Sequence, residues 1–86
     1  MPSIESAIQA ELPAIQEIRH DLHAHPELGY HERRTSGVVR RELEAANIKH
    51  VDGLAGGTGV LAYLPATANE ASAQTIALRA DMDALP

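Results

Sequence analysis

The sequence contains no cysteine, phenylalanine or tryptophan. Without cysteine, neither a disulfide framework nor a thiolate zinc site can form within these 86 residues. The aromatic residues are Tyr30 and Tyr63 alone, so the predicted core consists of Ile, Leu, Val and Ala, with few large side chains. A chain of this length buries only about 60–65% of its unfolded surface. We therefore expect it to be marginally stable and to belong to a larger protein.

Long apolar runs and basic clusters are missing as well. No run approaches the roughly 20 apolar residues of a membrane span, and Met1–Glu5 lacks the basic start of a signal peptide. Seven Lys and Arg residues against twelve Asp and Glu give a net charge of −5, and no basic stripe is interleaved with aromatic residues, which excludes typical nucleic-acid-binding proteins. These absences predict a cytoplasmic protein that binds neither nucleic acid nor membrane.

The first half of the chain predicts two amphipathic helices. From residue 3 to about residue 23, apolar residues recur at spacings of three and four: Ile4, Ile8, Leu12, Ile15, Ile18 and Leu22. Pro13 interrupts this stripe, so the helix should kink or restart there, and it should stop before His25–Pro26. A second helix is predicted from residue 31 or 32 to Ala46, ending at Asn47. Its buried stripe comprises Val38, Val39, Leu43 and Ala46.

The second half predicts three strands, at residues 48–51, 60–64 and 75–80. The glycine-rich stretch 53–59 lies between the first two strands. Because a strand follows it rather than a helix, it predicts a hairpin connection and not a phosphate-binding loop. Residues 65–74 are small and polar and predict a surface loop. The expected fold class is α/β, with residues 1–86 forming two helices and then three strands of a single, incomplete domain.

Two carboxylates follow the third predicted strand. Asp81 and Asp83 lie two residues apart, which would point both to one side of an extended chain where the strand ends. Open α/β sheets keep their functional sites there. Such a pair can bind a divalent cation, orient a metal-bound histidine or perturb each other's pKa. The alternative is structural, with the acids capping a turn before Pro86.

Three histidines, His20, His23 and His25, lie close together near the end of the first helix. Only His20 and His23 share a helix face, so their spacing does not supply three metal ligands. Histidines at a helix end also interact favourably with the helix dipole. A structural role is therefore predicted for all three.

Three stretches resemble the M20 peptidase family of metal-dependent amidohydrolases, in the branch of hippurate, N-acyl-amino-acid and auxin-conjugate hydrolases. They are Arg19–Gly29 (RHDLHAHPELG), Gly53–Val60 (GLAGGTGV) and Leu78–Pro86 (LRADMDALP), in the family's order and spacing. The resemblance covers nearly all of this sequence but only about the first fifth of such a two-domain enzyme. It implies the beginning of a mixed-sheet, metallopeptidase-like catalytic domain.

The resemblance also implies roles for individual residues. Asp83 matches the acid that orients a metal-binding histidine or steadies the metal centre, and it is the one candidate catalytic residue. Asp81 stands where other M20 branches carry a histidine ligand, and it is not assigned as a ligand. The family uses one or two divalent ions, here expected to be Zn or Mn, with a glutamate as general base. The glutamate and the metal ligands, among them those of a Cys-Gly-His-Asp stretch, are expected beyond Pro86.

The predicted substrate is therefore a small N-acyl or N-aroyl amino acid, and the 86-residue chain alone is expected to be inactive. The predicted strand at 75–80 would form a flat apolar edge that favours association, so a homo-oligomer is a further expectation. One alternative is a catalytically inactive interaction module that stands alone. Another is a dipeptidase or carboxypeptidase of the same family. Continuation of the reading frame into Cys-Gly-His-Asp would favour an enzyme, and a stop codon after Pro86 the module.

Overall fold

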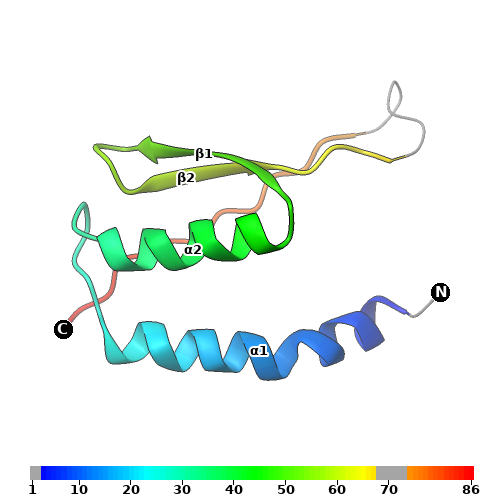
Figure 1. Cartoon of the computed structure of the whole chain (residues 1–86), viewed down its shortest axis with the longest axis horizontal. Helices are drawn as coiled ribbons and strands as arrows, with labels where there is room; N and C mark the ends of the chain where they lie inside the picture. Colours follow the sequence, from blue (N-terminus) through cyan, green and yellow to red (C-terminus); the bar gives the residue numbers. More distant parts are fainter. Residues whose placement is uncertain (1–2, 68–73) are drawn as a thin grey trace.

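The computed structural model describes residues 3–67 and 74–86 of the chain. These residues form two helices followed by a two-stranded antiparallel sheet: α1 (Ile4–Ala24), α2 (Arg33–Ala45), β1 (Lys49–Leu54) and β2 (Gly59–Tyr63). Figure 1 shows α2 between the hairpin and α1, so that the elements form three successive layers. The predicted α/β order of two helices followed by strands is confirmed for these four elements.

Helix α1 is a single helix of 21 residues. It begins where the Ser3 side chain accepts a hydrogen bond from the Ser6 backbone N–H at 3.0 Å, which satisfies one free donor of the first turn. It continues through Pro13, so the alternative of a restart is wrong, and its first turns are angled relative to the rest in Figure 1. It ends at Ala24, before His25 and Pro26, as predicted. None of its residues is buried, and no helix in the described ranges is long and apolar enough to cross a bilayer.

Helix α2 ends as its sequence predicts. Asn47 adopts a left-handed conformation with φ of 61°, and its N–H donates to the Glu44 carbonyl at 3.1 Å. The Ile48 N–H donates to the Leu43 carbonyl at 2.9 Å. These two bonds satisfy carbonyls that the last helical turn leaves free, which is the Schellman arrangement. The chain is thereby turned sharply into β1.

The buried face of α2 differs from the predicted stripe. Val38 is 5% exposed and is the one buried hydrophobic residue in the described part of the chain. Val39 and Leu43 are half-buried, whereas Ala46 is exposed. The other buried helix residues are polar, Thr35 and Ser36 in the first turns. The buried residues of α2 therefore lie in its N-terminal half, where Thr35 contacts Glu27 of the α1–α2 loop.

The hairpin forms as predicted, with β1 running on to Leu54. Val51 lies opposite Leu61 and Lys49 opposite Tyr63, and the register shifts between Val51 and Leu54. The glycines of the connection have identifiable functions. Gly57 has a φ of 130°, which other residues rarely adopt, and a Cβ on Gly59 would lie 3.1 Å from the Leu54 backbone. A tight turn that brings the two strands together requires both.

The structure does not show the third predicted strand. Residues 74–86 adopt neither helix nor strand, and Ile76 and Leu78 are almost fully exposed. A strand is held by ladder hydrogen bonds to a neighbouring strand, and here the segment runs past α2 on its own (Figure 1). Most of the predicted loop at 65–74 lies outside the described residues.

The chain exposes much more surface than a folded monomer of its mass. Its accessible surface is 7510 Å², whereas about 4,900 Å² is typical of a monomer of 9.2 kDa. Its radius of gyration is 15.0 Å, against about 12 Å for a compact domain of this length. The helices and the hairpin are thus formed, but they leave most of their large apolar side chains exposed.

Candidate functional site

A shallow pocket of about 320 Å³ lies where the end of α1, the start of α2 and the C-terminal segment meet. From α1 and the following loop it is lined by Leu22, His23, Pro26 and Glu27, from α2 by Thr35 and Val39, and from the C-terminal segment by Ala80–Ala84. The floor is mostly apolar, and four titratable side chains stand around it: His23, Glu27, Asp81 and Asp83. Apolar pockets with a few convergent polar groups are the usual form of binding sites.

The two acids predicted from the sequence both line this pocket, but they differ in their partners. The Asp81 carboxylate lies 3.1 Å from Nε and Nη2 of Arg79, two residues earlier. Asp83 is followed by Ala84, whose N–H donates to the Glu27 carbonyl at 2.7 Å. Because the segment is not a strand, the predicted projection of both acids from a strand end is not shown. The backbone next to Asp83 is held against the α1–α2 loop.

The three histidines are separated by the structure. His23 lines the pocket, whereas His20 does not. His25 lies just beyond α1, where its Nδ1 is 3.0 Å from the Asp21 carbonyl and 3.7 Å from the Asp21 carboxylate. A histidine that contacts the last carbonyls of a helix stabilises the helix end, which agrees with the predicted structural role. Of the three, only His23 is near the acids.

Glu27 makes the most hydrogen bonds in the site, although the sequence analysis included it only within the first motif stretch and assigned it no role. Its carboxylate accepts hydrogen bonds from the Arg34 N–H at 3.0 Å, the Thr35 N–H at 2.6 Å and the Thr35 Oγ1 at 2.7 Å. The residue at the N-cap position of α2, Glu32, makes no side-chain capping bond. A carboxylate seven residues before the first of these donors therefore caps the helix. The absence of Ser, Thr, Asp or Asn before α2 was the available signal that a remote cap was needed.

Hydrogen bonding lowers the pKa of two carboxyls at this end of the molecule. The pKa of Glu27 lies below its ordinary value mainly because Thr35 Oγ1 donates to it, with further help from the Thr35 and Arg34 backbone and against the effect of burial. The pKa of Asp21 is lowered mainly by the Arg34 guanidinium, whose Nη2 lies 2.7 Å away. The same contact raises the pKa of Arg34. Both carboxylates are therefore ionised at neutral pH.

The lowered pKa of Glu27 predicts that the fold is weakened by acid. A carboxyl whose pKa is lower in the folded state stabilises the fold above its unfolded pKa of about 4.3, and this stabilisation is lost as the pH falls through the folded value. The change Thr35→Val removes the main cause, so we expect NMR titration of the Glu27 carboxyl carbon to give a higher pKa in this variant. Glu17→Gln, on the exposed side of α1, is the control. An unchanged Glu27 pKa in Thr35→Val would contradict the assignment.

A second contact joins α2 to the glycine-rich turn. Thr58 Oγ1 donates to the Glu32 carboxylate at 3.4 Å, and the two residues are only 4% and 9% exposed. Thr58 belongs to the second of the motif stretches noted in the sequence, and Glu32 immediately precedes α2. Sequence reasoning did not select either residue, because the pairing spans 26 positions and follows from tertiary packing.

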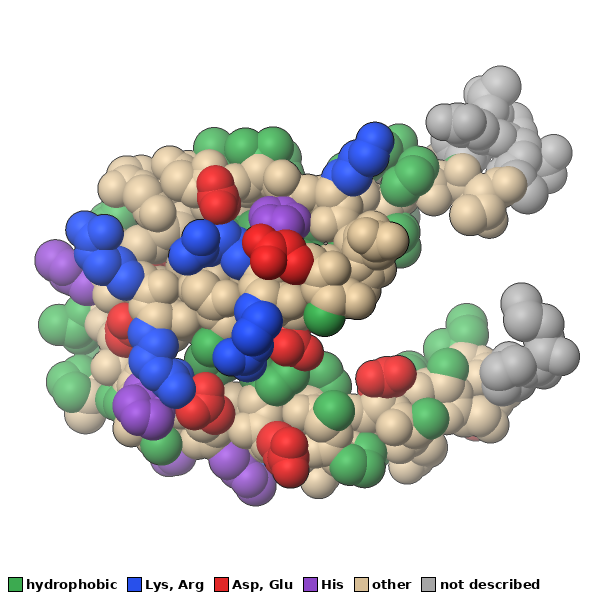
Figure 2. Space-filling view, in the orientation of Figure 1, with side chains coloured by type: hydrophobic (Ala, Val, Ile, Leu, Met, Phe, Trp, Pro, Cys, Tyr) green, Lys and Arg blue, Asp and Glu red, His purple; other side chains and the backbone are tan. Residues whose placement is uncertain are grey.

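Figure 2 shows charged side chains of both signs on the face of the molecule that it presents. Three arginines of α2 are paired, across elements or along the helix: Arg34 Nη2 with Asp21 at 2.7 Å, Arg40 Nη1 with Asp52 at 3.5 Å and Arg41 Nε with Glu42 at 3.4 Å. Exposed pairs of this kind contribute about 0–1 kcal/mol each. All six of these paired side chains are partly exposed to solvent.

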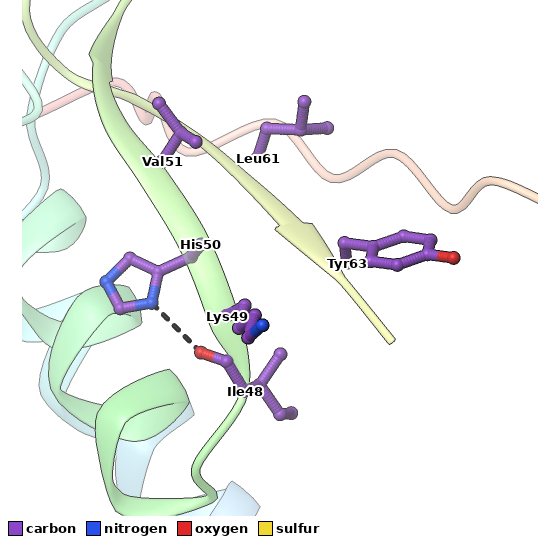
Figure 3. Close-up of a pocket in the computed structure, with 6 residues that line it drawn as sticks. All are labelled: Ile48, Lys49, His50, Val51, Leu61 and Tyr63. Atoms are coloured by element: carbon purple, nitrogen blue, oxygen red, sulfur yellow. Dashed lines mark hydrogen bonds between the residues drawn. The ribbon is translucent and has the colours of Figure 1, made fainter. Parts of the chain in front are cut away.

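A larger hollow, of about 640 Å³, lies on the sheet face turned away from α2. Figure 3 shows Val51, Leu61 and Tyr63 projecting from this face, while His50 points towards α2 and its Nδ1 lies 3.1 Å from the Ile48 carbonyl. Val51, Leu61 and Tyr63 are 58%, 64% and 60% exposed. No acid lines this hollow, so it is suited to contact with other apolar groups rather than to catalysis.

The described residues do not form a metal site. Residues 3–67 and 74–86 contain no group of three or more His, Asp or Glu side chains placed to hold an ion. A zinc site takes three or four protein ligands held together, and His23, Asp81 and Asp83 are not grouped in that way, so they do not form a complete centre. Alone, the pocket can bind and orient polar groups, and it presents an acid at its edge.

Two kinds of relative match most of the chain. It is 50% identical over 70 residues to a protein named as a candidate glutamate–cysteine ligase of Rhodococcus jostii (strain RHA1), a match that covers 81% of this chain and 8% of that protein. It is 43% identical over 76 residues to an uncharacterized hydrolase of Staphylococcus aureus (strain USA300), which covers 88% of this chain and 18% of that hydrolase. The strain N315 hydrolase matches equally.

The chain thus spans less than a fifth of the length of these relatives. No family model and no solved structure matches it. This chain is therefore similar to one segment of larger proteins, several of which are named as hydrolases.

Proposed function

We propose that residues 1–86 are the beginning of the catalytic domain of a metal-dependent amidohydrolase of the M20 peptidase family. The whole enzyme would hydrolyse the amide bond of N-acyl or N-aroyl amino acids. The hydrolase names of relatives that are 43% identical support a hydrolase. The three motif stretches support the family and the amide substrate.

The observation that carries this proposal is the meeting of the first and third motif stretches. Four residues of the first stretch (Leu22, His23, Pro26 and Glu27) and Ala80–Ala84 of the third are far apart in the chain, yet they line one pocket, and the Ala84 N–H donates to the Glu27 carbonyl at 2.7 Å. Segments that only cap turns have no reason to converge in this way. The convergence supports a shared function for the two stretches, of which Asp83 is one of the pocket-lining residues.

The uncovered apolar surface supports the view that the domain continues beyond this segment. The sheet face of Val51, Leu61 and Tyr63 is exposed, and so are Ile76 and Leu78. In the whole enzyme, we propose that the remaining chain completes the mixed sheet, pairs with residues 75–80 and covers this face. A sheet covered on both faces is the usual arrangement in α/β proteins.

Asp83 is proposed to act as a positioning acid at the metal centre, whose ligands for Zn or Mn lie outside these residues. The described residues supply the pocket wall and this acid, and no complete metal centre. The 86-residue chain is accordingly expected to bind no catalytic ion on its own and to be inactive.

An assay of two polypeptides tests the proposal. The 86-residue chain and the longer polypeptide that contains it are purified and incubated with hippurate and N-acetyl amino acids, with and without a chelator. We expect hydrolysis by the longer polypeptide only, and we expect the chelator to abolish it, because the ligands and the general base lie outside this segment. The control is a mock purification from cells that lack both genes.

Three outcomes would contradict the proposal. Hydrolysis by the 86-residue chain above the mock level would show that this segment is catalytically complete. A longer polypeptide that leaves N-acyl amino acids intact but cleaves dipeptides would favour a dipeptidase or carboxypeptidase of the family. A reading frame that stops at Pro86, with no activity, would favour the interaction module.

A further inference from the structure

Glu27 is the point where three segments of the chain are joined. Its side chain accepts three hydrogen bonds from Arg34 and Thr35 at the start of α2, at 2.6 to 3.0 Å. Its backbone carbonyl accepts the Ala84 N–H at 2.7 Å. One residue of the α1–α2 loop therefore fixes both the helix and the C-terminal segment.

The side-chain bonds are needed because α2 has no cap of its own. Glu32 at the N-cap position makes no capping bond, and the first turn contains no acid. Thr35 is 5% exposed, so its N–H and hydroxyl cannot turn to solvent when Glu27 is removed. Leaving buried donors without an acceptor is strongly unfavourable. The Glu27 carboxylate is consequently held in one place by the helix, and the backbone of Glu27 with it.

The hydrogen bond from the Ala84 N–H to the Glu27 carbonyl makes the position of Asp83 depend on that of Glu27. The Ala84 N–H belongs to the peptide that joins Asp83 to Ala84, so the bond to Glu27 sets the orientation of that peptide. Residues 74–86 have no helix or strand to hold them. The placement of Asp83 in the pocket, which Thr35 and His23 also line, therefore depends on this contact.

We propose that Glu27 is a positioning residue, which sets where Asp83 stands in the pocket by linking helix α2 to the Asp83–Ala84 peptide. This inference rests on the proposed function for its catalytic consequence, and on the hydrogen bonds alone for its structural part. Misplacement of a catalytic group by about 1 Å can cost a hundredfold in rate. Loss of the link should therefore lower kcat while substrate affinity changes little.

The test uses the longer polypeptide with Glu27→Ala, Glu27→Gln and the control Glu17→Ala, an exposed α1 position. Hydrogen–deuterium exchange of peptides covering residues 80–86 reports the Ala84 contact. We expect Glu27→Ala to lose the protection of this segment and to lower kcat about ten- to hundredfold, with KM changed less than about threefold. Glu27→Gln keeps an acceptor oxygen and should restore part of both. The control should match the wild type.

Thr35→Val is the second variant, in case Glu27→Ala does not fold. It removes one bond to the carboxylate but keeps both backbone donors. We expect a smaller loss of protection at 80–86 and a smaller fall in kcat. Wild-type protection and wild-type kcat in the folded variants would overturn the inference, as would a wild type that shows no protection at 80–86.

The two proposals can fail separately. If the wild-type polypeptide hydrolyses no N-acyl amino acid, the proposed function fails, and the exchange measurement still decides whether Glu27 holds the Asp83–Ala84 peptide. If hydrolysis is present and Glu27→Ala changes KM rather than kcat, Glu27 contributes to substrate binding and its positioning of Asp83 is contradicted.

Discussion

The change Asp83→Asn in the longer polypeptide is expected to lower kcat/KM about ten- to hundredfold, the usual loss when a residue that orients a metal ligand is changed. The Asn side chain has almost the same shape, so the pocket and the Ala84 contact to Glu27 should persist. What is lost is the negative charge that would hold a ligand in its productive orientation. Steady-state kinetics with hippurate, together with the metal content of the purified variant, measures the effect.

Asp81→Asn is the matched control for this prediction, because Asp81 lines the same pocket but pairs with Arg79. We expect it to retain most of the activity. Asp83→Glu should recover part of the rate, since it restores the charge at a slightly different distance. If Asp83→Asn were as active as the wild type, Asp83 would be a turn residue, and the site assignment would be wrong.

Introducing a charge at Leu61 should have a small effect on the stability of the short polypeptide and a large one on that of the long polypeptide. In the 86-residue chain Leu61 is 64% exposed, so Leu61→Asp should change the unfolding free energy by at most about 0.5 kcal/mol. If the remaining chain covers this face, the same change places an unpaired carboxylate in an apolar contact and should cost about 3–5 kcal/mol. In a domain of 150–250 residues that corresponds to a Tm lower by roughly 10 °C.

Thermal unfolding of both polypeptides measures this difference, with Leu61→Met as a control that conserves volume and should cost less than about 1.5 kcal/mol in either. Sedimentation of the 86-residue chain adds a second readout. Its exposed sheet face should cause association, and Leu61→Asp should reduce it. An equal and small effect of Leu61→Asp in both polypeptides would show that the face stays uncovered.

Local features of the fold were predictable because each depends on residues close together in the chain. The end of α1 follows from Pro26, the end of α2 from Asn47, and the hairpin from the glycines between two apolar runs. The third strand was not obtained, because a strand exists only when a neighbour accepts its hydrogen bonds. The apolar alternation of residues 75–80 indicates that this segment can form a strand once a neighbouring strand pairs with it. That neighbour must come from another part of the whole protein.

The candidate site was predictable in part for the same reason. Asp83 could be selected because the motif around it is continuous in sequence, and it does line the pocket. Glu27 was missed because its donors at Arg34 and Thr35 are seven and eight positions away and show no capping pattern. The contact of Thr58 with Glu32 could not be predicted, since it requires the hairpin to be folded onto the helix.

The start of the 13-residue helix α2 contacts several distant segments of the chain. Glu32 at its start holds the glycine-rich turn through Thr58, Arg34 reaches Asp21 on α1, and Thr35 holds Glu27, which in turn holds Ala84. Each of the three motif stretches is thus hydrogen-bonded, directly or through Glu27, to residues at the start of α2. Substitutions on the outer surface of the hairpin would alter the structure only near the substituted residue. A substitution at the start of α2 would displace all three motif stretches together.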